Sequence, residues 1–245
     1  MTALCVVNAL VLVVAPWALW VRRDTVNSRW DAPITAGIAL FALGAALDSP
    51  WSDVAAASFP LIGKFYLLNC LGHISYLLGA TRGLKAVALR LMRNDAIGPF
   101  MRTRIMAPVL LASGVMLVCL LKSPATSAMP AENLYFVAPD GWLLAYWVTY
   151  FTALTGLNAV AIYGSITLRS APSSTTHDLL VGATALGTLS CWGFFAAIVT
   201  GAHRLIETVA WPGTQIAIIG GAVACALSWR HRAAALGRRI QPPRT

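Results

Sequence analysis

The chain of 245 residues is 58% hydrophobic and only 11% charged, and its net charge is +9. A soluble globular domain carries far more charge than this, so the composition excludes one. The basic side chains lie in gaps between long apolar stretches. That placement is typical of membrane topology and of contact with anionic lipid, and it argues against nucleic acid as a partner.

Seven apolar stretches follow one another along the chain. A helix needs about 20 apolar residues to cross roughly 30 Å of hydrocarbon, and lipid tolerates only helices or closed barrels. Continuous apolar runs without strict alternation favour helices. We therefore predict an all-α membrane protein in which one bundle of seven transmembrane helices occupies residues 1–245. The predicted spans are about 3–21, 32–47, 58–80, 105–121, 142–168, 179–201 and 212–229.

The basic residues predict the orientation of these spans. Fifteen of the 18 Lys and Arg residues fall in alternate gaps, while the opposite gaps hold only Lys122 and Arg204. Basic residues beside short loops are retained in the cytoplasm, so the N-terminus is predicted outside and the C-terminus inside. The predicted cytoplasmic bases are Arg22, Arg23, Arg29, Arg82, Lys85, Arg90, Arg93, Arg102, Arg104, Arg169, Arg230, Arg232, Arg238, Arg239 and Arg244.

Two basic segments are predicted at the cytoplasmic face. In the first, Leu84, Val87, Ala88 and Leu91 fall within about 100° of helix arc, which indicates an amphipathic helix over 82–93 lying in the membrane interface. The second is a basic cytoplasmic tail over 230–245. The residues predicted to contact anionic lipid headgroups are Arg82, Lys85, Arg90 and Arg93.

A stripe of polar residues marks the third span. Tyr66, Asn69, His73 and Tyr76 are spaced three, four and three residues apart, so they share one helix face. Polar groups in a span avoid lipid, which directs this stripe into the bundle. With Asn158 of the fifth span, the stripe is a candidate ligand-binding site. The alternative is a row of interhelical hydrogen bonds, which the sequence favours because His73 has no charged partner within the spans.

The chain offers no pattern for catalysis, metal binding or a cofactor. It contains no HExxH, GxSxG or P-loop sequence, and no pair of acidic residues within a span. The last span lacks a lysine that could bind retinal, and His73 alone could serve as an intramembrane haem ligand. We expect a protein that is not an enzyme and that has no metal site and no cofactor.

The beginning of the chain carries a family resemblance. Asn8 lies in a short first span, and Arg22-Arg23-Asp24 and Asn27 follow it. This pattern resembles integral membrane proteins with seven spans and unassigned function from high-GC actinobacteria, and the 15 Arg against three Lys are typical of such genomes. The resemblance implies a location in a bacterial cell membrane, the inner membrane, and implies no activity.

Two functions are compatible with these features. The first is a non-enzymatic sensing or partner-binding module, whose cytoplasmic or membrane protein partner would contact the basic surfaces around 81–104 and 230–245. The second is a small-solute transporter or channel with a site between the third and fifth spans. Transport usually requires more polar or broken-helix features within the membrane, so the sequence favours the first.

Overall fold

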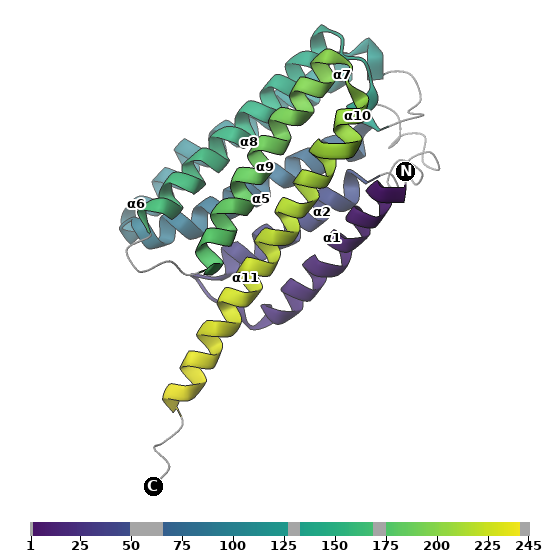
Figure 1. Ribbon diagram of the computed structural model, residues 1–245. Coiled ribbons are helices and arrows are strands. Elements are labelled where there is room, and N and C mark those ends of the chain that lie inside the picture. The colour runs from purple at the N-terminus through teal and green to yellow at the C-terminus, as the bar shows by residue number, and fades with distance from the viewer. Residues whose placement is uncertain (1, 50–65, 127–132, 169–174, 241–245) are drawn as a thin grey trace.

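The computed structural model describes residues 2–49, 66–126, 133–168 and 175–240, which are almost entirely helical and include no strand. The prediction of an all-α fold is therefore confirmed. Seven long helices lie side by side in one bundle (Figure 1). They are α1 (Thr2–Val21), α2 (Ala32–Leu47), α5 (Leu67–Leu91), α7 (Ala107–Lys122), α8 (Gly141–Thr167), α9 (Thr175–Thr200) and α11 (Trp211–Ile240).

Short elements mark the two ends of the bundle. At one end α6 (Asn94–Pro99) and the π-helix η3 (Phe100–Met106) lead into α7. We call this the basic end, because α1 and α5 end here among arginines and lysines. At the opposite end, the loop end, η4 (Pro124–Thr126) and η5 (Leu134–Phe136) join α7 to α8, while α10 (His203–Leu205) and the π-helix η6 (Ile206–Ala210) precede α11 (Figure 1).

Five helices close a ring. In order around it, α2 packs on α5, α5 on α8, α8 on α9, and α9 on α11, which touches α2. The remaining two helices cover seams of the ring: α1 lies across α2 and α11, and α7 lies across α8 and α5. The ring fixes which helix faces point inward, and those faces define the site described below.

Two pairs of glycines let α2 and α5 approach closely. Gly37 faces Gly79, and Gly44 faces Gly72, with seven residues separating the members on each helix. A Cβ atom on Gly44 would lie 3.0 Å from the Gly72 carbonyl oxygen and 2.6 Å from Cε1 of Tyr76. The Tyr76 ring therefore rests on the bare backbone of α2, as it could not do on any larger residue.

The connection between α7 and α8 is anchored to the bundle. Asp140 caps α8 by accepting a hydrogen bond from the Leu143 N–H (2.8 Å), and it also accepts from the Ser123 hydroxyl (2.6 Å). Desolvation opposes its ionisation, but these hydrogen bonds outweigh that effect and hold the pKa of Asp140 below its ordinary value. Leu134 and Tyr135 of η5 are buried, so this loop folds back into the end of the bundle.

Four helical segments are long and apolar enough to cross a membrane: Asn94–Lys122, Gly141–Thr167, Asp178–Thr200 and His203–His231. Two shorter apolar helices cover Val6–Val21 and Ala32–Leu47. The beginning of the predicted third span, 58–65 with Lys64, lies outside the described residues. Seven crossings and their orientation stay predictions.

The segment 82–93 differs from our expectation of a separate interfacial helix. It continues α5 without a break to Leu91, and Arg93 lies beyond the helix at the start of α6. The physical reason is that the apolar arc has protein to pack on: Leu84 and Ala88 belong to the buried core, and Val87 lies against Gly164 of α8. The predicted tail also continues a helix, since α11 extends to Ile240, while 241–245 lie outside the described residues.

Candidate functional site

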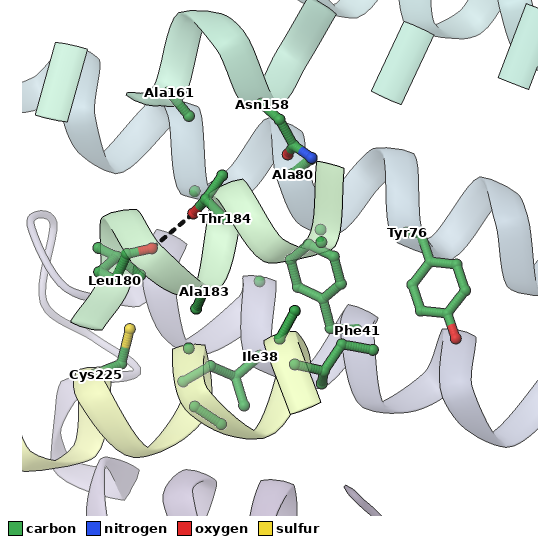
Figure 2. A pocket seen from close by; sticks show the side chains of 18 of the residues that line it. Ile38, Phe41, Tyr76, Ala80, Asn158, Ala161, Leu180, Ala183, Thr184 and Cys225 are labelled. Atoms are coloured by element: carbon green, nitrogen blue, oxygen red, sulfur yellow. Dashed lines mark hydrogen bonds between the residues drawn. The ribbon is translucent and has the colours of Figure 1, made fainter. Parts of the chain in front are cut away.

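The helices of the ring line a central cavity of about 500 Å³. Its wall is formed by α2, α5, α8, α9 and α11, with Arg22 and Arg90 at the basic end and Tyr135 at the loop end. Figure 2 shows apolar side chains from several helices facing one another across it, among them Ile38, Phe41 and Ala183. The cavity is therefore mainly apolar along its length and polar at both ends.

Two polar groups on the middle of the wall have hydrogen-bond partners within the protein. Asn158 donates a hydrogen bond from Nδ2 to the Thr188 hydroxyl on α9 (3.1 Å). Thr184 donates to the Leu180 carbonyl one turn earlier (2.8 Å; Figure 2). A guest molecule in this region would meet chiefly methyl and aromatic groups, the rings of Tyr76 and Tyr150 among them.

A chain of hydrogen bonds lies buried beside the cavity at the loop end. His73 of α5 contacts Tyr146 of α8 through Nδ1 (2.5 Å) and Tyr135 of η5 through Nε2 (2.8 Å). The Tyr135 hydroxyl donates to Oδ2 of Asp48, the residue that ends α2 (3.1 Å). Asn69 donates to the other carboxylate oxygen of Asp48 (3.2 Å). Three helices and one loop therefore meet at these side chains.

The direction of each hydrogen bond follows from counting protons. Burial, with Asp48 nearby, raises the pKa of Tyr135 well above its ordinary value, so this hydroxyl stays protonated. It uses its one proton to donate the hydrogen bond to Asp48. The Tyr135 oxygen must then accept from His73, so Nε2 of His73 carries a proton. When Nδ1 carries none, it accepts from the Tyr146 hydroxyl, and every group in this chain of hydrogen bonds is satisfied.

Aromatic rings hold this chain in place. Tyr135 stacks between Trp147 (ring centroids 5.0 Å apart) and Phe194 (4.3 Å), and the edge of Trp211 closes a third side. The Trp211 indole N–H donates to Oδ1 of Asn8 on α1 (3.2 Å). The ring of the loop residue Tyr135 is thus packed among aromatic side chains and forms one end of the cavity.

A second buried polar cluster lies at the basic end. Arg22 is completely buried and donates to the Thr35 hydroxyl (3.1 Å) and to the Cys225 carbonyl on α11 (2.8 Å). Its guanidinium and that of Arg90 each lie 3.6 Å from the Asp31 carboxylate. A buried charge is costly unless it is paired and hydrogen-bonded, and here the pairing joins α1, α2, α5 and α11.

The structure distributes the predicted ligand residues over two places. Asn69 and His73 belong to the hydrogen-bonded chain and are fully packed, whereas Tyr76 and Asn158 lie on the cavity wall. Tyr66 is buried at the start of α5 with a left-handed backbone conformation (φ 53°). The stripe therefore faces into the bundle, yet its four residues and Asn158 do not converge on one ligand.

The predicted headgroup residues also separate into two pairs. Arg82 and Lys85 border a groove at the basic end, while Arg90 pairs with Asp31 and Arg93 pairs with Asp95 (3.5 Å).

Several residues of the site were not anticipated from the sequence. Asp48, directly after the predicted span 32–47, supplies a charged partner for His73, with its Oδ1 3.6 Å from Nε2. The end of α2 lies beside the start of α5, where Asn69 and His73 lie, because these two helices pack antiparallel. Arg22 was interpreted only as a marker of topology, and nothing in its local sequence shows that it is buried.

No known protein family, no curated protein and no solved structure matches this chain. Among the residues that the structure describes, no group of three His, Cys, Asp or Glu side chains could hold a metal ion. The function must therefore be argued from the cavity and the two polar clusters themselves.

Proposed function

We propose that this chain is an integral protein of a bacterial cell membrane that binds a small, mainly apolar molecule and acts as a non-enzymatic sensing module. The central cavity carries this proposal. Its volume of about 500 Å³ lies within the range of roughly 300–1,000 Å³ over which protein pockets hold small ligands. Its apolar wall with polar ends is the composition that such pockets usually have.

Binding fits the wall better than catalysis does. His73 and Asp48 do not line the cavity, and their side-chain nitrogen and oxygen atoms are hydrogen-bonded within the buried chain. A reacting group must come within hydrogen-bond reach of its substrate. Neither residue can do so while Tyr135 stays in place.

The basic end offers the surface through which a bound state would be communicated. The last turns of α11 project beyond the other helices there (Figure 1). Arg22 ties α11 to α2 through the Cys225 carbonyl, directly beside the cavity. We place the contact with a protein partner on this projecting part of α11, since a shift of α11 around a ligand would move it.

A cavity-filling substitution tests the proposal. Ala183 faces the cavity (Figure 2), so Ala183→Trp should fill part of it, whereas Ala196→Trp on the exposed side of the same helix should not. The full-length proteins, purified in mild detergent, are denatured, and the small molecules they release are identified by mass spectrometry. We expect an apolar molecule enriched with the wild type and Ala196→Trp but lost from Ala183→Trp. Release of identical molecules by all three proteins would contradict ligand binding in the cavity.

A small-solute transporter is the second candidate, because the cavity lies between α5 and α8 with Asn158 on its wall. The transporter should carry the bound molecule across the membrane, whereas the sensing module should only bind it. The molecule identified above, added to sealed vesicles containing the protein, should cross the membrane only if the chain is a transporter, and Ala183→Trp should then abolish its entry. Binding without flux supports the sensing module.

A further inference from the structure

A groove at the basic end carries a positive charge that nothing in the described protein neutralises. It lies between the start of α2, the end of α5 and α6, and its volume is about 590 Å³. Its wall includes Arg29, from the segment before α2, and Arg82 and Lys85 of α5. The wall includes no acidic residue. We call it the basic groove.

The neighbouring carboxylates are committed to other bases. Asp31 is shared by Arg22 and Arg90, Asp95 pairs with Arg93 (3.5 Å), and Asp24 pairs with Arg23 (3.9 Å). Within the described ranges, by contrast, no carboxylate lies within 4.0 Å of the charged nitrogen atoms of Arg29, Arg82 or Lys85. Three cations held together without a counterion repel one another, so an anion in the groove would relieve that repulsion.

One of the three bases is held in position. The Arg29 guanidinium donates to Oδ1 of Asn94 on α6 (3.0 Å) and lies over the Trp30 ring, 5.9 Å from its centroid. An oriented guanidinium presents paired N–H donors that match two oxygens of a phosphate group. Arg82 and Lys85, one turn apart on α5, add donors from the other side of the groove.

The remaining wall of the basic groove is apolar. It includes Ala32, Pro33 and Ala36 of α2 and the buried side chains of Leu89 and Ile97. Two large aromatic side chains near this end, Trp20 and Trp30, are strongly exposed, as is usual for rings at a membrane interface. A free phosphorylated solute would gain nothing from these features, whereas a lipid would place its acyl chains along them.

We propose that the basic groove binds the phosphate group of an anionic phospholipid, with Arg29, Arg82 and Lys85 as its ligands. The site is distinct from the central cavity, because Arg82 and Lys85 project from α5 away from the face that carries Tyr76 and Ala80. It rests on the proposed membrane location but not on any ligand in the cavity. It keeps Arg82 and Lys85 from the predicted headgroup set and adds Arg29, while Arg90 and Arg93 form ion pairs with Asp31 and Asp95.

The test compares two triple variants of equal charge. The groove variant carries Arg29→Gln, Arg82→Gln and Lys85→Gln; the control variant carries Arg23→Gln, Arg93→Gln and Arg102→Gln, three exposed bases outside the groove. Each full-length protein in detergent is titrated with dioleoyl phosphatidylglycerol, and bound lipid is counted by native mass spectrometry. Dioleoyl phosphatidylcholine serves as the zwitterionic comparison.

We expect the groove variant to bind phosphatidylglycerol about tenfold or more weakly than the wild type, because it loses three charge-assisted contacts. The control variant should change the affinity less than twofold, and Lys85→Arg alone should keep it. Equal losses in both triple variants would show diffuse charge attraction and overturn the site. Displacement of the lipid by millimolar inorganic phosphate would overturn the assignment to a lipid. If the groove variant fails to fold, the single variant Lys85→Gln must still weaken binding, and unchanged binding would refute the proposal.

Discussion

At the scale of single residues, the central feature is the buried chain from Tyr146 through His73 and Tyr135 to Asp48. The sequence predicts that Asn69 and His73 face the interior, because their spacing places them on one helix face. It does not predict their partners. Asp48 lies 25 positions before His73, and their meeting depends on the register in which α2 packs on α5. Tyr135 belongs to a loop whose composition resembles an ordinary surface connection.

Removing one hydroxyl from this chain should destabilise the whole protein. Tyr135→Phe keeps the ring stacked between Trp147 and Phe194 but removes the hydrogen bonds that its hydroxyl makes to Nε2 of His73 and to Oδ2 of Asp48. Buried polar groups left unsatisfied cost about 1–3 kcal/mol each, so we expect a clear fall in the thermal unfolding midpoint in detergent. Tyr163→Phe, at an exposed position of α8, is the matched control and should leave the midpoint unchanged. A Tyr135→Phe protein as stable as the wild type would show that this chain of hydrogen bonds contributes nothing to stability.

At the scale of helices, apolar length predicts position well and function poorly. The expected stretches 3–21 and 32–47 correspond closely to α1 and α2, because apolar runs bounded by arginine, aspartate and proline leave little freedom. The segment 82–93 shows the limit of this reasoning. Its amphipathic pattern is real, but periodicity alone cannot distinguish a face that packs on lipid from one that packs on α8.

The glycine pairs between α2 and α5 provide a test of helix packing. Gly44→Ala would place a Cβ atom 2.6 Å from the Tyr76 ring and 3.0 Å from the Gly72 oxygen, so the helices must separate. Overpacking of this kind costs about 1–3 kcal/mol, which exceeds the gain of roughly 1 kcal/mol that alanine brings to a helix. Gly83→Ala in α5, where nothing lies within 4 Å of the new atom, should be neutral or stabilising. Thermal unfolding of both variants measures the difference, and equal stability would mean that the close approach is not required.

At the scale of the whole molecule, the closed ring is the property that the sequence conceals. Each helix can be placed along the chain from its own residues, but the contact between α11 and α2 joins segments about 180 positions apart. The cavity exists only because that contact closes the ring, so no local pattern could reveal it. Small residues on α11, such as Ala217 and Ala222, indicate close packing but not the space that the ring leaves at its centre.

The distribution of charge over the molecule leads to a prediction about orientation. Within the described ranges, the bases that the sequence assigns to the cytoplasm belong to elements at the basic end. This end should face the cytoplasm, because moving basic residues across a membrane is opposed during insertion. Ala96→Cys in α6 and Ala202→Cys before α10 place one exposed residue at each end of the bundle. Both are made in a variant whose five native cysteines have been replaced. A membrane-impermeant maleimide applied to intact cells should label Ala202→Cys and leave Ala96→Cys unlabelled until the cells are permeabilised. Labelling of Ala96→Cys alone on intact cells would reverse the orientation and would place the basic groove and the projecting α11 on the outer face.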